Sequence, residues 1–261
     1  MDYNLSDIAK DINMLAAFCG PRDLSGLNKT VVSDLLRKPQ ADLFVLFGGS
    51  IVAGGDVLYE AMRQKAAKHY LIVGGAGHTT ETLRVQMKKY LPGFSCSGAS
   101  EAELFDEYLF VKYGVRADFL EKSSTNCGNN ITYMLDLIGR EGVDFSSVIL
   151  CQDLTMQRRM SAGLEKYAPS VRILNYASYT AEITASDGKL VFINSPKGMW
   201  ETDRFVSLLL GEIPRLEDKG YGPSGKNFIA HVDIPEEVLA AHKRLALKFP
   251  ELVRIANPRY A

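Results

Sequence analysis

Cysteine is scarce in this chain, and its few copies are spaced too widely to form a metal site. The four cysteines are Cys19, Cys96, Cys127 and Cys151. No C-x-x-C pair occurs, and no cysteine lies near a histidine at the spacing of metal ligands. Structural zinc is therefore not expected, and no metal site is predicted. Cys19 and Cys151 end apolar segments, which favours small core residues over nucleophiles.

An excess of charge of one sign and a long apolar run are also missing. Thirty basic residues face 31 acidic ones, for a net charge of -1, and no basic block stands out, so nucleic acid is not an expected partner. The longest uncharged apolar stretch, Leu43 to Gly55, is too short and too rich in glycine to span a membrane. The first residues show no signal-peptide pattern. We expect a cytoplasmic protein with reduced thiols, while nothing in the sequence predicts an oligomeric state.

What the chain does contain is a regular alternation of short apolar runs and helical segments. This alternation predicts an α/β fold, a Rossmann-like three-layer αβα arrangement around a mostly parallel five-stranded sheet. Residues 1–40 are expected to form N-terminal helices, 41–180 the α/β core, and 181–261 a small C-terminal α+β appendage or lid. Within that appendage, residues 228–234 alternate as a strand does and 235–249 read as a helix. The predicted strands of the core are 42–47, 69–73, 117–121, 146–151 and 171–175.

Glycine-rich turns follow the first two predicted strands. In an open parallel sheet, the residues just past the carboxyl ends of the strands line the ligand crevice. A glycine turn that opens a helix suits a phosphate or a carboxylate, although close packing alone also explains such a turn. The full dinucleotide fingerprint is not met, because Thr80 stands where a third glycine belongs, and this disfavours NAD. His78 reads either as a helix cap or as a ligand contact. The predicted binding residues of these turns are Gly48, Gly49, Ser50, Gly74, Gly75, Gly77, His78 and Thr79.

Polar side chains follow the third and fourth strands. The hydroxyls and amides after the third strand suit a ribose, an amide or an adenine edge, whereas a helix N-cap explains only one or two of them. After the fourth strand, a carboxylate and adjacent arginines suit an anionic group, with an Asp–Arg pair bracing the helix start as the alternative. The predicted binding residues here are Ser124, Thr125, Asn126, Asn130, Gln152, Asp153, Thr155, Gln157 and Arg158.

The stretch from Gly220 to Lys226 imitates a phosphate-binding P-loop. The next residue is Asn227, where a magnesium-binding Ser or Thr belongs, and the flanking pattern lacks the required strand-then-helix order. We therefore reject an ATPase, while the glycines and Lys226 remain candidates for a lid over the crevice.

Taken in order, these turns resemble the YdcF-like family, the domain of unknown function shared with SanA and ElyC. The chain departs from the family pattern at Thr155, where the family usually has His, and at Asn129, where it often has Glu. The resemblance implies a Rossmann-like core and a nucleoside-like ligand, with S-adenosylmethionine as the favoured cofactor. The matching segments are Gly74–His78, Glu101–Ala102, Glu121–Asn130, Gln152–Arg159, Gly220–Gly225 and Phe228–Asp233.

Three functions remain open from the sequence. The leading one is binding of S-adenosylmethionine or a related nucleoside, with or without catalysis. The second is a hydrolase or transferase acting on a phosphorylated sugar or envelope precursor, with Arg158, Arg159 and Lys226 holding phosphate. Its candidate catalytic bases are Glu101, Glu121 and Asp153. The third is a ligand sensor without chemistry, which the absence of a complete catalytic triad favours.

Overall fold

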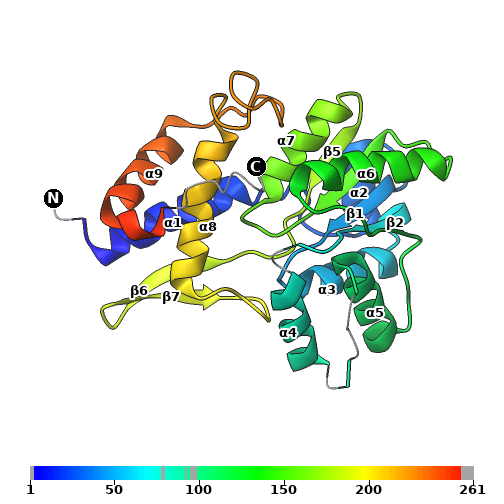
Figure 1. Ribbon diagram of the computed structural model, residues 1–261, viewed down its shortest axis with the longest axis horizontal. Helices are drawn as coiled ribbons and strands as arrows, with labels where there is room; N and C mark the ends of the chain where they lie inside the picture. Colours follow the sequence, from blue (N-terminus) through cyan, green and yellow to red (C-terminus); the bar gives the residue numbers. More distant parts are fainter. Residues whose placement is uncertain (1–2, 78–79, 92, 95–98, 254–261) are drawn as a thin grey trace.

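The computed structural model describes residues 3–77, 80–91, 93–94 and 99–253. Helices and strands alternate through the first two thirds of the chain (Figure 1). The helices are α1 (Leu5–Cys19), α2 (Lys29–Leu36), α3 (Ala53–Arg63), α4 (Thr80–Tyr90), α5 (Glu101–Tyr113), α6 (Cys127–Arg140), α7 (Gln157–Tyr167), α8 (Thr202–Leu216), α9 (Glu236–Lys248) and the 3-10 turn η1 (Pro250–Leu252). The strands are β1 (Ala41–Phe47), β2 (Ala67–Val73), β3 (Phe119–Glu121), β4 (Ser147–Cys151), β5 (Arg172–Asn175), β6 (Glu182–Ser186) and β7 (Lys189–Asn194).

The first five strands form one sheet in the order β3-β2-β1-β4-β5, and every pairing in it is parallel. This confirms the predicted α/β fold with its five-stranded parallel sheet. From β1 the chain adds β2 and β3 on one side, and then crosses back to add β4 and β5 on the other side of β1. Ligands of open parallel sheets bind at this kind of switch point, beyond the carboxyl ends of the strands.

The central strands are buried on both faces because helices cover each of them. All seven residues of β1 are buried. On one face, Phe44 and Leu46 belong to a hydrophobic core that includes residues of α2, α3, α4 and α5. On the other face, Leu43, Val45 and Phe47 pack in a core with residues of α6 and α7. The strict alternation of these side chains follows from the two-residue repeat of a strand.

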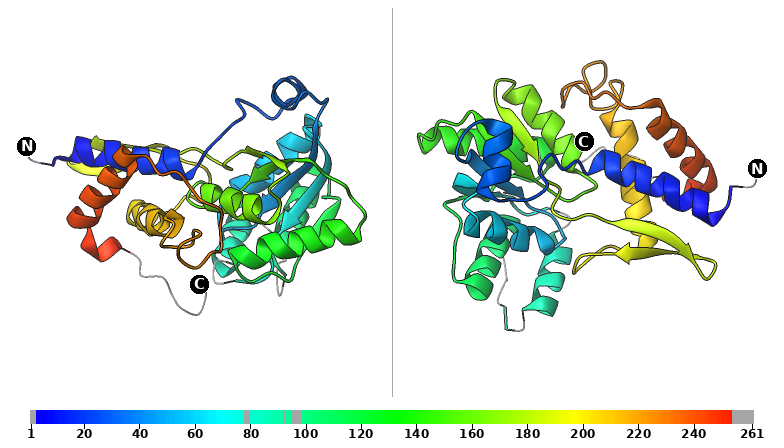
Figure 2. Two further views of the ribbon diagram at one scale, coloured as in Figure 1. Left: turned by 90° about the horizontal axis from the view of Figure 1, so that it is seen from above. Right: turned by 180° about the vertical axis from the view of Figure 1, so that it is seen from behind.

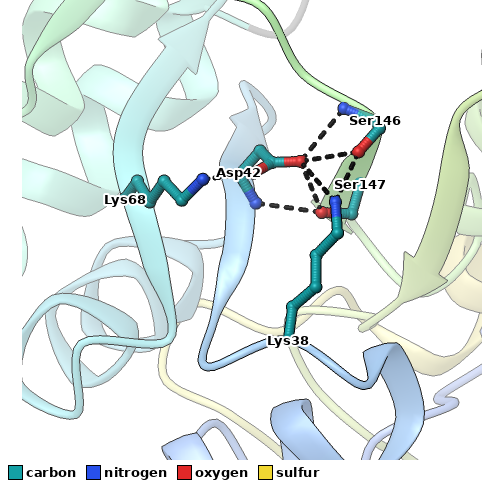
Figure 3. A network of polar contacts seen from close by, with 5 residues as sticks. All are labelled: Lys38, Asp42, Lys68, Ser146 and Ser147. Atoms are coloured by element: carbon teal, nitrogen blue, oxygen red, sulfur yellow. Dashed lines mark hydrogen bonds and ion pairs between the residues drawn. The ribbon is translucent and has the colours of Figure 1, made fainter.

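At the amino ends of the strands, a polar network built on Asp42 ties β1 to the first residues of β2 and to the start of β4 (Figure 3). Asp42 Oδ2 accepts hydrogen bonds from the Ser146 amide at 3.0 Å, the Ser146 hydroxyl at 3.0 Å and the Ser147 hydroxyl at 2.9 Å. Lys68 Nζ lies 2.7 Å from Asp42 Oδ1, and Lys38 Nζ lies 3.4 Å from Oδ2. This network is at the edge opposite to the predicted ligand crevice.

A second group of elements packs beside the α/β core. Figures 1 and 2 show α1, α8, α9 and the β6–β7 hairpin together on one side of the molecule. Their apolar side chains form a third hydrophobic core, in which residues of α1 lie with those of α8 and α9. The first helix therefore packs with the C-terminal elements, far from it in sequence. The sequence did not predict the antiparallel β6–β7 hairpin, and in the structure residues 228–234 form no strand.

Within the part of the chain that the structure describes, no helix has the length and apolar character needed to cross a membrane.

Candidate functional site

A cleft with a volume of about 670 Å³ lies over the carboxyl edge of the sheet. Its floor is made by the turns after β1, β2, β3 and β4, and its walls by residues of α6, α7, α8 and the loop after α8. Of the residues predicted from the sequence, the structure places Gly48, Gly49, Ser50, Gly74, Gly75, Gly77, Glu101, Ser124, Thr125, Asn126, Asn130, Gln152, Asp153 and Thr155 on the lining. His78 and Thr79 fall outside the described residues.

The glycine turns owe their composition to close packing within the protein. A Cβ atom on Gly75 would lie 2.0 Å from the Ser124 carbonyl oxygen, and one on Gly48 would lie 2.5 Å from a carboxylate oxygen of Glu101. Because the first contact is with backbone, no side-chain movement relieves it. These glycines therefore let neighbouring strand-end turns approach one another, whatever the cleft binds.

The amide groups of these turns are largely bonded within the protein. The Gly48 amide donates to the Val73 carbonyl at 2.6 Å, and the Gly74 amide to the Glu121 carbonyl at 3.0 Å. The Gly75 amide donates to the Ser124 hydroxyl at 3.2 Å, and the Gly77 amide to the Thr80 hydroxyl at 2.8 Å. An anion bound at the turn would have to compete with these partners, so the turn differs from a phosphate-binding cradle with open amides.

Glu101 places a buried carboxylate beside these turns. It is the first residue of α5 and is 7% exposed. Oε1 accepts a hydrogen bond from the Thr80 hydroxyl at 3.0 Å. The backbone of α5 begins on the same turn, because the Glu101 amide donates to the Gly75 carbonyl at 2.9 Å. A carboxylate here favours hydroxyl or ammonium groups of a ligand and repels anions.

Asn126 and Asn130 have different roles in the turn after β3. Asn126 is the N-cap of α6, and its Oδ1 accepts from the Asn129 amide at 3.0 Å, as the capping alternative predicted. Asn130 lines the cleft, and its side-chain amide has no hydrogen-bond partner among the described residues. Glu121 is buried but lies off the cleft lining, with Oε1 accepting from the Ser123 and Ser124 amides at 2.7 and 3.1 Å. Asn130, in the first turn of α6, therefore offers a ligand both the donor and the acceptor of its side-chain amide.

Asp153 is a buried carboxyl group at the end of β4, on the floor of the cleft. Its Oδ1 accepts from the Thr155 amide at 2.9 Å, the Thr155 hydroxyl at 2.7 Å and the Tyr179 hydroxyl at 2.9 Å. Burial raises the pKa of Asp153 above its ordinary value, and the interactions with Thr155, Tyr179 and Trp200 oppose that rise only in part. A carboxyl group held this way can keep its proton nearer neutral pH than an exposed one.

Two predicted residues at the start of α7 lie outside the cleft lining. Gln157 is fully buried under the end of β4, where its amide nitrogen donates to the Leu150 carbonyl at 2.9 Å. Arg158 turns toward α1, donates to the Phe18 carbonyl and places its guanidinium 4.1 Å from the centre of the Phe18 ring. Asp153 is not among the hydrogen-bond partners of Arg158. The prediction that Arg158 lies in the crevice came from its match to the YdcF-like pattern and its place near the helix start. Neither feature shows what packs beside each of two neighbouring arginines.

The wall contributed by α8 was missed by sequence reasoning. Its lining residues repeat at helical spacing and share one face of the helix. The apolar residues Phe205, Leu209 and Ile213 are buried in the core of the C-terminal group. Charged residues at this spacing were a readable signal, but no local pattern indicates that they face the carboxyl ends of the strands. The cleft residues of α8 are Arg204, Leu208, Glu212 and Arg215.

A buried ion pair joins this wall to α7. Arg159 Nε lies 2.7 Å from Glu212 Oε2, and Arg159 Nη2 lies 3.1 Å from Glu212 Oε1, a two-pronged contact. Arg215 Nη1 lies 3.9 Å from Glu212 Oε1. The two exposed fractions of the Arg159–Glu212 pair are 13% and 5%, so loss of one partner would leave an uncompensated buried charge.

The loop from Gly220 to Lys226 supplies aromatic rather than phosphate-binding groups. Tyr221 lines the cleft and packs edge-on against Phe228, with ring centres 5.4 Å apart. Amides of the loop bond to its own carbonyls, as in the Lys226 amide to the Gly220 carbonyl at 2.9 Å. Lys226 lies off the cleft lining, 5.5 Å from the centre of the Tyr221 ring.

Among the described residues, no group of three or more His, Cys, Asp or Glu side chains is arranged to hold a metal ion. No known family model matches the chain.

Proposed function

We propose that this protein binds a nucleoside-like small molecule in the cleft, with S-adenosylmethionine as the leading candidate. The observation that carries the proposal is the cleft itself, which lies at the carboxyl edge of a parallel sheet and has a volume of about 670 Å³. Sites for cofactors and ligands of this size are typically about 300–1,000 Å³ and often sit at this edge.

The lining chemistry supports a ligand with a polar sugar-like part and a flat ring. Glu101 and Asp153 are acceptors suited to hydroxyl or amino groups, and Asn130 offers both a donor and an acceptor. Tyr221, Phe228 and Trp200 supply aromatic faces on the opposite side of the cleft. The resemblance to YdcF-like proteins adds the preference for S-adenosylmethionine over other nucleosides.

Isothermal titration calorimetry against S-adenosylmethionine, S-adenosylhomocysteine, NAD and sugar nucleotides tests this proposal. We expect the first two ligands to bind most tightly. Asn130→Ala should weaken their binding roughly 2- to 10-fold, as loss of a neutral hydrogen bond does. Asn194→Ala is the matched control, because Asn194 is exposed at the end of β7 and lies off the cleft lining. Tight NAD binding with no response to either adenosyl ligand would overturn the ranking.

The cleft contains the only tryptophan of the chain, Trp200, which allows binding to be localised. A ligand in the cleft should change the emission of Trp200 at the same concentrations at which calorimetry detects heat. Calorimetric binding that leaves this emission unchanged would place the ligand elsewhere.

A second candidate function, hydrolysis or transfer on a phosphorylated substrate, is favoured by one specific observation. Asp153, a buried carboxyl group with a raised pKa, shares the cleft with Arg159, Arg204 and Arg215. Acid–base catalysis needs a proton-carrying group near substrate, and arginines stabilise phosphate charge.

A further inference from the structure

The charged groups of the cleft are divided between two walls. The carboxylate of Glu101 and the carboxyl group of Asp153 lie at the carboxyl ends of the strands, whereas Arg159 on α7 and Arg204 and Arg215 on α8 carry the positive charge. Glu212 is the acidic residue on the α8 wall. An anionic group of a ligand is therefore attracted to the arginines and repelled from the sheet edge.

The three arginines are not equally available. Arg159 is held by both oxygens of Glu212, and Arg215 lies near the same carboxylate while donating to the Gly211 carbonyl. Among the described residues, Arg204 has no hydrogen bond and no ion pair, and its guanidinium lies 5.7 Å from the centre of the Trp200 ring. Arg204 and Arg215 are eleven residues apart on α8, about 16 Å along the helix axis, so they serve different ends of the cleft.

The glycine turns offer little competition for an anion. Four of their amides already have partners within the protein, and the Glu101 carboxylate lies against Gly48 and Gly74. The remaining rival is the amino end of α6, whose first residues also line the cleft.

We propose that Arg204 is the residue that recognises an anionic group of the ligand, a phosphate or a carboxylate attached to a nucleoside. The proposal rests on the cleft being the nucleoside site, and it adds which end of that site carries the charge. A guanidinium free of carboxylates can form a two-pronged contact with either anion. The neutral part of the ligand then lies toward Asn130 and the sheet edge.

The test compares ligands that differ in charge by calorimetry. Adenosine is neutral, AMP adds a phosphate, and S-adenosylhomocysteine adds a carboxylate together with an ammonium group. In the wild-type protein, we expect at least one of the two charged ligands to bind about 10-fold or more tightly than adenosine. Arg204→Ala should remove that advantage, weakening the charged ligand roughly 10- to 150-fold while adenosine changes less than about 3-fold. Which charged ligand responds decides between phosphate and carboxylate.

Two variants serve as controls. Arg172→Ala removes another exposed arginine without an ion pair among the described residues, but at the amino end of β5, and should leave all affinities unchanged. Arg204→Lys should retain part of the preference, because a lysine keeps the charge without the fork. Thermal unfolding of Arg204→Ala should match the wild type, since Arg204 is exposed.

The outcomes separate this proposal from the proposed function. If Arg204→Ala keeps the full preference for the charged ligand, the anion binds elsewhere, at the amino end of α6 or near Arg159, and the proposal is overturned. If no nucleoside binds, the proposed function fails. Titration with inorganic pyrophosphate, followed by Trp200 emission, then tests whether Arg204 forms an anion site on its own. A pyrophosphate response lost in Arg204→Ala supports the anion site alone, whereas no response, or one that Arg204→Ala leaves unchanged, overturns it.

Discussion

Replacing Asp42 by alanine should destabilise the protein far more than removing either lysine that contacts it. The side chain of Asp42 is 7% exposed, whereas those of Lys38 and Lys68 are 46% and 56% exposed. Ion pairs with such exposed lysines contribute about 0.2–1 kcal/mol each to the free energy of unfolding. Hydrogen bonds to a buried charged acceptor contribute about 1.5–3 kcal/mol each before non-additivity. Ser146 and Ser147 supply three of these.

We therefore expect Asp42→Ala to lower the free energy of unfolding by about 3–5 kcal/mol. Lys38→Ala and Lys68→Ala should each lower it by about 1 kcal/mol or less. Urea unfolding at pH 7 measures all three. Asp34→Ala is the matched control, because Asp34 is exposed on α2 and has no ion pair among the described residues; it should change stability by less than about 0.5 kcal/mol.

The pH dependence gives the same network a second test. Burial alone would raise the pKa of Asp42, but hydrogen bonds from Lys68, Ser146 and Ser147 outweigh it and hold the pKa well below its ordinary value. The stabilisation is therefore fully present above the ordinary pKa of 3.8 and is lost as the pH falls from there toward the lowered value. The stability gap between the wild type and Asp42→Asn should narrow below about pH 4. The dominance of the serine contacts is refuted if Lys68→Ala lowers the free energy of unfolding as much as Asp42→Ala does. It is also refuted if the stability difference between the wild type and Asp42→Asn stays constant as the pH falls below about 4.

Three further predictions concern Arg158 and Asp153. Arg158→Ala should lower the free energy of unfolding by about 1–3 kcal/mol, because it removes the hydrogen bond and ring contact to Phe18, and it should leave ligand affinity unchanged; a stable variant with weakened binding would return Arg158 to the cleft. In the wild type, ionising the buried Asp153 is unfavourable, so the free energy of unfolding should fall as the pH rises above the ordinary pKa of 3.8 through the raised value. Asp153→Asn should abolish this fall. If the protein hydrolyses phosphorylated substrates, colorimetric phosphate release should also fall sharply in Asp153→Asn, and retained release would exclude Asp153 as the acid.

The parallel sheet was predictable because strand burial leaves a strong mark on the sequence. All residues of β1 and β4 and the last four of β2 are buried, so these strands read as short apolar runs in the sequence. The predicted strand ends fall within two residues of those observed. The hairpin β6–β7 gave a weaker signal, because most of its residues are exposed or only partly buried. Its position depends on α1, where Asn13 bonds to both backbone groups of Ile183 at 2.8 Å.

The floor of the cleft was predictable for a related reason. In parallel sheets all carboxyl ends meet at one edge, so residues after each strand can be gathered without knowing any contact. The role of each residue in the cleft depends on its hydrogen-bond and packing partners, which the sequence does not identify. Asn126 caps a helix while Asn130 remains open, and Arg158 faces α1 while Arg159 faces Glu212. These differences arise from packing between distant segments, which local patterns do not record.

The difference in charge between the two walls of the cleft orients a ligand that carries both a neutral and an anionic part. The buried residues Glu101 and Asp153 lie at the carboxyl ends of the strands and belong to the α/β core. The α8 wall belongs to a different hydrophobic core, whose members come from both ends of the chain. A ligand that contacts Asn130 and Arg204 together therefore bridges two separately packed groups of elements. Such a ligand stabilises the folded state by an amount set by its concentration relative to its Kd. The anionic contact should add to that stabilisation only when α8 is packed against the α/β core. Thermal unfolding with AMP and with adenosine measures this coupling, because a shift that is larger for AMP and disappears in Arg204→Ala requires the two walls to act on one molecule.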